Sequence, residues 1–271
     1  MSRVFVITLC FLWYSSSAQY IPDFVGSQAA AMGGVSTLLP SVWSSANNPG
    51  ALGNLKNTEI ALNHQQLYGQ KELAFTSFSG AYKHRSGVWA LYANKWGYEW
   101  YQYNQLGAAF GKSLSNKWSA GINCSYNQFS FGDNYYGKAS NIRVGFGSLA
   151  KLPNKLSIGF YIQNLHRPNV LKDGTEKDEP SFTAGMGYKA STNTFLAIEA
   201  FQQLNQPLCL RMGMEFAHKE KYFFRTGIST QPFSGSFGFG VAYKKIRLNL
   251  AASWHNVLGF SPQSGLHYVA E

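Results

Sequence analysis

Runs of about ten residues in which apolar and polar or small residues alternate recur along most of the chain. In the run 117–127 the apolar residues occupy every second position, from Trp118 to Tyr126, and small or polar residues stand between them. Runs 206–216 and 245–255 repeat this pattern. A period of two is typical of β-strands whose two faces meet unlike surroundings. The pattern therefore predicts a chain dominated by strands.

About fourteen such candidate strands follow one another from residue 59 onward; the alternation is weaker near 73–83 and 87–94, where the faces are not assigned. Short connections follow every even-numbered strand and longer ones follow most odd-numbered strands, such as 95–100, 132–138 and 164–180. An even strand number and this alternation are typical of single-chain outer-membrane barrels. We predict an all-β fold, an antiparallel transmembrane β-barrel of about fourteen strands over residues 59–271. The predicted strands begin near Glu59, Lys71, Gly87, Tyr101, Lys117, Ala139, Lys155, Ser181, Thr194, Gln206, Tyr222, Ser236, Ile246 and Gly265.

The composition narrows the class of protein. Only 13% of the residues are charged and 16% are aromatic, with 27 glycines, whereas about a quarter of an ordinary soluble domain is charged. Disordered chains are poor in aromatic residues, and no window beyond residue 18 approaches the roughly 20 apolar residues of a spanning helix. A secreted all-β protein or an outer-membrane barrel remains, and the alternating connections favour the barrel.

The first eighteen residues have the order of a secretory signal peptide. Arg3 precedes an apolar stretch at 4–14, and Ser16, Ser17 and Ala18 supply small residues for cleavage. We predict a signal peptide at 1–18, removed on export, and location in the outer membrane of a Gram-negative cell. The mature chain then keeps only Cys124 and Cys209, too few for a disulfide framework.

Lysines stand beside aromatic rings where predicted strands meet the short connections. This pairing suits a membrane interface, where amphipathic side chains lie half in water; the alternative is that the lysines discourage aggregation of strand edges. The net charge of +10 needs no nucleic-acid partner, because no recognition helix or basic stripe is present. The expected partner is outer-membrane lipid. The pairs are Tyr82-Lys83, Lys117-Trp118, Tyr188-Lys189, Lys221-Tyr222 and Tyr243-Lys244.

Residues 19–58 differ from the rest and are predicted to form a plug. They are rich in small residues and contain two short helical stretches, interrupted at 33–34 and at Pro49, that would fit a lumen lined by Gly and Ser. The segment resembles the N-terminal signature of the FadL-like outer-membrane proteins, especially the branch with the PorV and PorQ proteins of type IX secretion. The resemblance implies a fourteen-stranded barrel closed by a hatch on the periplasmic side. It rests on Gly26, Met32, Gly33, Gly34, Asn48, Pro49, Ala51 and Leu52.

Several charged residues fall on the lumen face of the predicted strands. A tight connection at 204–206 places Glu199 opposite Arg211 across neighbouring strands, and Arg225 lies diagonal to Glu215. One interpretation is a structural lattice of ion pairs. The other is that a residue without an evident carboxylate partner, Arg143 or Arg247, binds the acid group of an amphipathic ligand. The full set is Arg143, Glu199, Arg211, Glu215, Arg225 and Arg247.

Signals for catalysis are weak. Six histidines are scattered, and the chain has no HExxH, no paired cysteine ligands and no phosphate-binding loop. We expect no catalytic residue, metal or cofactor; an enzyme built on Ser253 and His255 lacks an oriented nucleophile, base and orienting group. The acidic residues of connection 164–180 are expected to be solvated, since a calcium loop needs another spacing. They are Asp173, Glu176, Asp178 and Glu179.

Two functions are consistent with this pattern. The PorV-like resemblance implies an accessory subunit of an outer-membrane protein export or assembly machine, with other outer-membrane or periplasmic proteins as partners. The FadL-like resemblance implies a passive channel for small hydrophobic compounds, in which the plug shifts to open an exit. The first is our main expectation and the second is the alternative.

Overall fold

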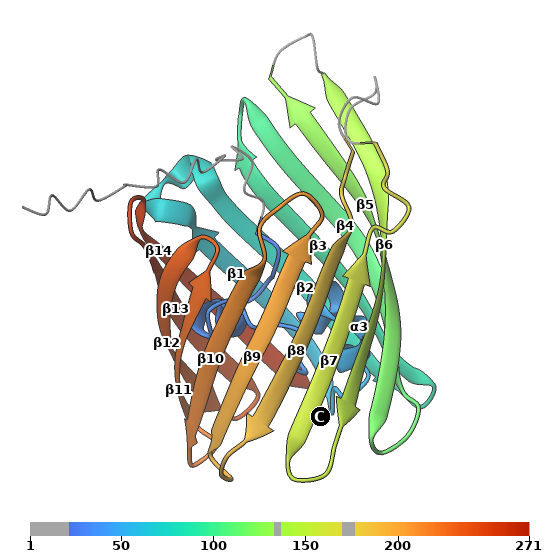
Figure 1. Ribbon diagram of the computed structural model, residues 1–271, viewed down its shortest axis with the longest axis vertical. Helices are drawn as coiled ribbons and strands as arrows, with labels where there is room; N and C mark the ends of the chain where they lie inside the picture. Colours follow the sequence, from blue (N-terminus) through green and yellow to red (C-terminus); the bar gives the residue numbers. More distant parts are fainter. Residues whose placement is uncertain (1–21, 133–136, 170–176, 271) are drawn as a thin grey trace, which may run out of the picture.

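The computed structural model describes residues 22–132, 137–169 and 177–270. Within them, fourteen antiparallel strands form one closed barrel, in which each strand pairs with its sequence neighbours and β14 pairs with β1 (Figure 1). The predicted fold class is confirmed. The predicted signal peptide at 1–18 lies outside the described residues. No helix in the described part of the chain is long and apolar enough to cross a bilayer.

The strands lengthen toward the middle of the chain, where β4 to β6 have 13 or 14 residues each. The bounds are β1 Thr58–Gln66, β2 Ala74–His84, β3 Gly87–Tyr98, β4 Tyr101–Ser113, β5 Trp118–Phe131, β6 Lys138–Lys151, β7 Leu156–Gln163, β8 Ser181–Lys189, β9 Thr194–Gln203, β10 Cys209–His218, β11 Tyr222–Thr230, β12 Phe233–Tyr243, β13 Ile246–His255 and β14 Gly259–Ala270. We call the end with the connections β2–β3, β4–β5 and β6–β7 the short-turn end, and the opposite end the long-loop end.

Some predicted boundaries are wrong. The last strand begins at Gly259 rather than near Gly265, and β2 begins at Ala74 because residues 67–73 form two 3₁₀ turns, η1 (Leu67–Gly69) and η2 (Lys71–Leu73). The predicted connection 95–100 is mostly strand, because β3 continues to Tyr98. Lys95 is exposed on the outer face, so a polar residue interrupts the apolar pattern without ending the strand.

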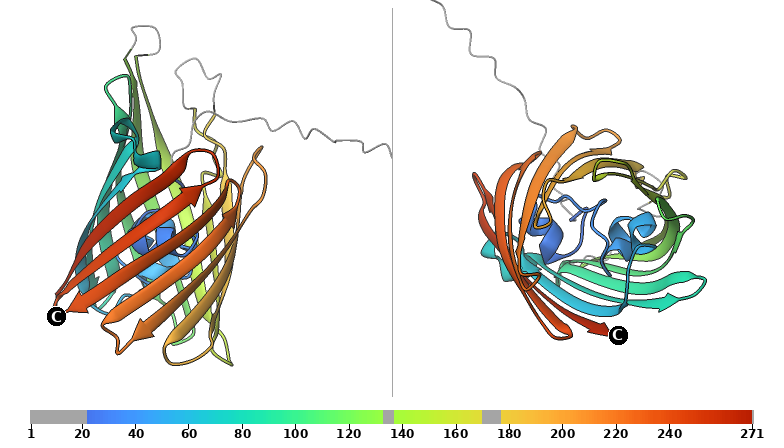
Figure 2. Two further views of the ribbon diagram at one scale, coloured as in Figure 1. Left: turned by 90° about the vertical axis from the view of Figure 1, so that its left-hand side faces the viewer. Right: turned by 90° about the horizontal axis from the view of Figure 1, so that it is seen from below.

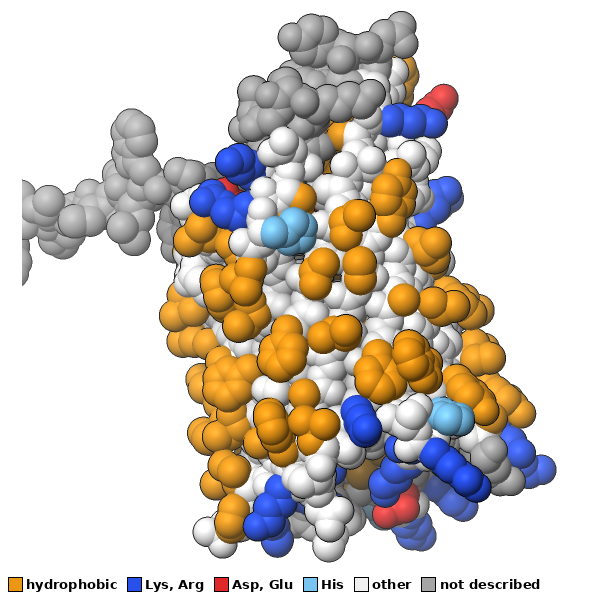
Figure 3. Space-filling model, turned by 90° about the vertical axis from the view of Figure 1, so that its right-hand side faces the viewer, with side chains coloured by type: hydrophobic (Ala, Val, Ile, Leu, Met, Phe, Trp, Pro, Cys, Tyr) orange, Lys and Arg blue, Asp and Glu red, His pale blue; other side chains and the backbone are white. Residues whose placement is uncertain are grey.

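The outer wall of the barrel is an apolar belt. In β5, Trp118, Ile122 and Tyr126 are exposed, whereas Ser119, Asn123 and Asn127 on the opposite face are buried in the lumen, as the alternation predicts. Figure 3 shows hydrophobic side chains across the middle of one face, with Lys and Arg side chains toward its two ends and most of them at the lower end. A surface of this kind suits lipid around the wall and water at the rim.

The core lies inside the barrel, between the wall and the plug. The plug, residues 22–57, crosses the lumen with three short helices, α1 (Ser27–Ala31), α2 (Ser44–Asn47) and α3 (Pro49–Leu52) (Figure 2). Helix α1 packs against β11 to β14, whereas α2 and α3 pack against β3 to β7. Val42 and Leu52 of the plug are fully buried among wall residues. The two cysteines are not bonded, since Cys124 is exposed and Cys209 is buried.

Candidate functional site

The Asn-Pro element of the plug joins α3 to the wall. The Asn48 side-chain oxygen accepts a hydrogen bond from the Gly50 amide (2.9 Å), which caps α3, and Pro49 occupies the first helical turn. The Asn48 amide group also donates to the carbonyls of Thr37 (2.7 Å) and Ser148 (3.1 Å). Asn48 is fully buried, so one side chain satisfies a helix end, a plug loop and strand β6.

Glycines on the wall give α3 the space it occupies. A Cβ atom added to Gly121 would lie 2.2 Å from the Pro49 carbonyl oxygen, and one at Gly147 would lie 2.0 Å from the Asn48 side-chain oxygen. One at Gly50 would lie 2.4 Å from the Cα of Ser148. Plug and wall backbones therefore touch directly here, with Ala51 and Leu52 of α3 fully buried beside them.

The Met-Gly-Gly run makes the corresponding contact on the other side of the lumen. Gly33 and Gly34 have φ angles of 71° and 90°, which favour glycine, and they turn the chain after α1. The Gly33 amide donates to the Ser236 hydroxyl (2.8 Å), and Met32 is fully buried against the backbone of Gly213. Gly26, at φ 105°, leaves space for the Trp43 ring.

Arg211 is the charged anchor of the plug. The register places Glu199 directly opposite it, and the two side chains pair at 3.2 Å. Arg211 also pairs with Asp23 of the plug and donates to the Gly34 carbonyl (3.2 Å). Its guanidinium lies over the ring of Phe24, 5.4 Å from the centroid. The fully buried Glu199 carboxylate accepts, in addition, the amides of plug residues 36 and 37.

A second ion pair lies beside the first. Glu215 is directly opposite Arg225 rather than diagonal to it, and their side chains are 2.6 Å apart. Gln28 of α1 donates to the Glu215 carboxylate (2.9 Å), and Arg225 donates to the Asn249 side chain (2.9 Å). Charged groups thus hold the plug to β9, β10 and β11 in addition to the backbone contacts of Met32 and Gly33.

Arg247 lies close to the short-turn end of β13, directly opposite His267 of β14. Its guanidinium lies over the Phe223 ring at 5.6 Å. Among the described residues its Nε atom, although buried, has no hydrogen-bond partner. His267 is fully buried and accepts a hydrogen bond from the Trp43 indole of the plug (3.1 Å).

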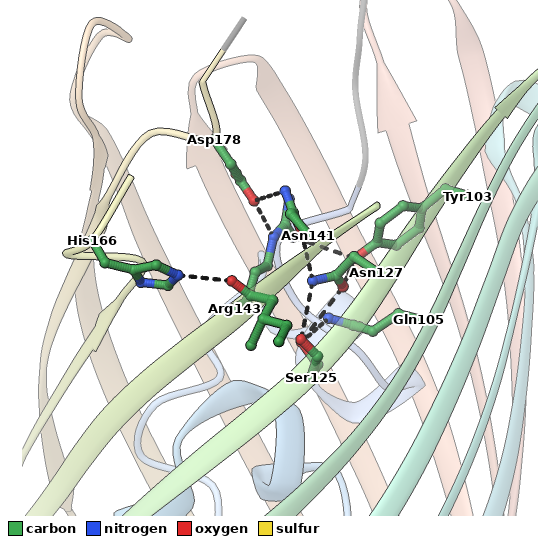
Figure 4. Close-up of polar contacts among 9 residues, drawn as sticks. Tyr103, Gln105, Ser125, Asn127, Asn141, Arg143, His166 and Asp178 are labelled. Carbon is green, nitrogen blue, oxygen red and sulfur yellow. Dashed lines mark hydrogen bonds and ion pairs between the residues drawn. The ribbon is translucent and has the colours of Figure 1, made fainter. Parts of the chain in front are cut away.

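Arg143 belongs to a polar cluster at the long-loop end (Figure 4). The expectation that Arg143 lacks a carboxylate is wrong, because it pairs with Asp178. The expectation that Asp178 is solvated is wrong for the same reason, since its side chain is 7% exposed. Asn141 also donates to Asp178 (3.3 Å), and Arg143 donates to the Tyr103 hydroxyl (3.3 Å). Asp173 and Glu176 lie outside the described residues.

An aromatic cluster fills the lumen beside this polar cluster. Trp96 and Tyr101 meet edge to face with ring centroids 5.4 Å apart, and Tyr103 and Phe129 are 5.1 Å apart. All its rings come from inward positions near the long-loop ends of β2 to β5. The aromatic cluster is Phe75, Trp96, Tyr101, Tyr103, Phe129 and Phe131.

The sequence pattern identified the charged wall residues but not most of their partners. Asp23, Gln28, Asn249 and Tyr103 each complete a contact with one of them, and no motif marks these four. The His255 Nδ1 atom accepts the amides of the following turn at 3.2 Å.

Comparisons with known proteins identify the fold. No protein-family model and no curated protein sequence matches the chain. Among solved structures, it is similar to the CymD monoaromatic hydrocarbon channel, with a TM-score of 0.72, 12% identity and coverage of 93% of this chain and 99% of that one.

Two further structures are similar. The Ralstonia pickettii toluene transporter TbuX has a TM-score of 0.70 and 10% identity, with 92% and 99% of the two chains covered. A Pseudomonas aeruginosa FadL homologue has a TM-score of 0.60 and 9% identity, with 90% and 97% covered. The chain therefore has the barrel fold of the FadL-like outer-membrane proteins, and identities this low establish the fold alone.

Proposed function

We propose that the chain is an outer-membrane channel for small hydrophobic compounds, of the size of a monoaromatic hydrocarbon. The observation that carries this proposal is the aromatic cluster, which lies above the plug in a barrel shaped like hydrocarbon channels. Apolar rings at the long-loop end receive an apolar solute from outside at little desolvation cost. The channel itself also has to reach the outer membrane, which requires the predicted signal peptide at 1–18.

The solute then has to pass the plug. The contacts of α3 with the wall are close backbone contacts. The plug also meets β10 and β11 through close backbone contacts of Met32 and Gly33 with Gly213 and Gly227, but its contacts with β9 to β11 include ion pairs and charged hydrogen bonds as well. A charged contact that becomes exposed during the shift can be replaced by water, whereas a packed backbone contact cannot. We infer that the part of the plug held by charge, Asp23 and residues 34–37, shifts to let the solute leave the lumen, while α3 and the Met32-Gly33 turn stay in place.

Uptake of radiolabelled toluene tests the proposal. The mature chain is reconstituted in lipid vesicles, and uptake is compared between wild type, Trp96→Ala and the matched control Trp100→Ala. Trp96 is a member of the aromatic cluster, whereas Trp100 is exposed in the β3–β4 turn. We expect Trp96→Ala to slow uptake about three- to tenfold, since a ring contact contributes about 0.5–1.5 kcal/mol, and Trp100→Ala to leave it unchanged. Wild-type vesicles that take up toluene no faster than empty vesicles contradict the channel.

The accessory-subunit function is our second candidate, and the comparisons give it less support than the channel. The observation that favours it is the filled lumen at the level of the plug, where Met32, Val42 and Leu52 are all fully buried. Purification in a mild detergent separates the two candidates. Stoichiometric co-purification of an outer-membrane or periplasmic protein supports the subunit, whereas a monodisperse barrel that takes up toluene in vesicles supports the channel.

A further inference from the structure

A row of amide side chains runs along the inner wall. Asn63 of β1 pairs with Ser77 of β2, which pairs with Asn94 of β3, and Asn94 pairs with Gln105 of β4. The row continues through Asn127 of β5 to residue 141 of β6. In the other direction it passes through position 265 of β14 to residue 249 of β13. Because barrel strands are tilted and staggered, such a row climbs the lumen.

The row joins the two ends of the lumen. Asn249 is the fourth residue of β13, counted from the short-turn end, and Asn141 is the fourth residue of β6, counted from the long-loop end. The one wall position without a side chain, Gly265, is filled from the plug, because a Cβ added there would lie 2.3 Å from the Ser27 hydroxyl oxygen. We call this set the amide track: Ser27, Asn63, Ser77, Asn94, Gln105, Asn127, Asn141 and Asn249.

The upper half of the amide track is closed by its own hydrogen bonds. Asn94 donates to Gln105 (2.6 Å), and Gln105 donates to Ser125 (3.0 Å). Asn127 donates to Asn141 (3.1 Å), which continues to the Arg143 cluster (Figure 4). These contacts form a chain of donors and acceptors that ends beside the aromatic cluster.

The lower half is different, since each of its members keeps one polar side-chain atom without a partner among the described residues. Five consecutive members of the amide track each have a buried side-chain atom with no hydrogen-bond partner in the described part of the chain. They are Asn249 Nδ2, Ser27 Oγ, Asn63 Nδ2, Ser77 Oγ and Asn94 Oδ1. An unpaired buried polar atom costs about 1–3 kcal/mol, so five in succession indicate a place that polar molecules occupy.

We propose that the amide track is a hydrated path by which small uncharged polar solutes pass the plug. Two of the unpaired atoms are amide donors and one is an amide acceptor. The other two are hydroxyl groups, which can donate or accept. A molecule that both donates and accepts, such as water or a polyol, can therefore exchange from one member to the next. This activity is additional to the proposed hydrophobic channel, because it uses the inner wall formed by β13, β14 and β1 to β6 rather than the aromatic rings.

Osmotic swelling of vesicles containing the full mature chain tests the track, with glycerol as the probe and the larger sugar raffinose as the size control. We expect wild-type vesicles to swell in isosmotic glycerol faster than empty vesicles, and not in raffinose. Asn63→Leu and Asn94→Leu should each slow glycerol swelling about tenfold, the effect of losing one hydrogen bond in the path. The matched control is Asn104→Leu, which makes the same change on the outward side of β4; it should leave swelling unchanged.

Three results would overturn the track. Wild-type vesicles that swell in glycerol no faster than empty ones exclude it without any variant. Equal glycerol swelling of Asn94→Leu and wild-type vesicles also excludes it, provided that heat-modifiable gel mobility shows the same folded fraction for both proteins. The third is a rise in the stability of Asn63→Leu without a change in swelling, which indicates a dry, unpaired amide. Toluene uptake is measured separately in the same vesicles. If wild-type vesicles swell in glycerol but take up no toluene, only the hydrophobic channel is contradicted.

Discussion

The plug is held in two unlike ways on its two sides. On the side of β4 to β7, backbone meets backbone at Gly121 and Gly147, and Asn48 satisfies the polar groups that remain. On the side of β9 to β11, backbone also meets backbone at Gly213 and Gly227, and Arg211 and Arg225 add ion pairs and hydrogen bonds to the plug. The first side depends on shape, and the second adds charge to shape.

Packing and ion pairs resist a displacement of the plug in different ways. Close packing is lost steeply with small displacements, because dispersion falls off within an ångström. Ion pairs weaken gradually and can be replaced by water at a modest cost when they become exposed. A plug fixed by shape at α3 and at the Met32-Gly33 turn, with charged contacts at Asp23 and residues 34–37, is therefore expected to rearrange at the charged contacts rather than to leave the lumen.

The largest effect is expected from Arg211→Met. This change leaves the fully buried Glu199 carboxylate without its cation, and breaking a buried pair in this way costs about 3–5 kcal/mol. A urea titration in detergent, followed by tryptophan fluorescence, measures the loss. Arg85→Met, in the exposed β2–β3 turn, is the matched control. Adding Glu199→Gln to Arg211→Met should recover part of the loss; no recovery contradicts the role of charge on this side.

A somewhat smaller loss, about 1–3 kcal/mol, is expected from Gly121→Val because the new side chain overlaps the Pro49 carbonyl and overpacking costs about this much. The change should also make the plug sensitive to trypsin at Lys56 in the folded barrel. Gly235→Val is the control, since nothing lies within 4 Å of a Cβ at Gly235. If both variants are cleaved at the same rate, the side of β4 to β7 is not held by shape.

Asn48→Ala should cost about 1–2 kcal/mol. The variant loses the cap of α3 and the two tethers to Thr37 and Ser148. The same urea titration measures it, with Asn116→Ala in the exposed β4–β5 turn as the control. A loss no larger than that of the control would mean that α3 is held by its glycine contacts alone.

The smallest effect is expected at the rim, where Lys151 donates to the Asn54 side chain (2.6 Å). Lys151 is exposed, and exposed polar contacts of this kind contribute about 0–1 kcal/mol. Lys151→Ala should therefore change the urea midpoint little, at low and at high salt alike. A loss as large as that of Arg211→Met would remove the distinction between buried and exposed charge on which the comparison depends.

The fold was predictable because the wall separates lipid from lumen at every second residue, as in β5 and β10. The pairing of Glu199 with Arg211 followed from one tight connection, since local register needs only local information. The partner of Arg143 was not predictable, because Asp178 reaches it from a long connection whose path no periodicity encodes. Residues 95–98 were misread as loop because the outer face of β3 becomes polar above the apolar belt. The amide track was hidden because its members meet only through the stagger of eight strands.

The pairing of β14 with β1 also constrains how the molecule is built. The plug precedes β1 in the chain, and β1 is one of the two strands that meet at the seam. An unclosed sheet can curl around residues 22–57, whereas a finished cylinder offers them only its rims as entrances. The glycine contacts on β4, β5 and β6 are all available before the seam is sealed. The sheet can then curve around the plug, so that the plug enters the lumen in the same step in which the barrel closes.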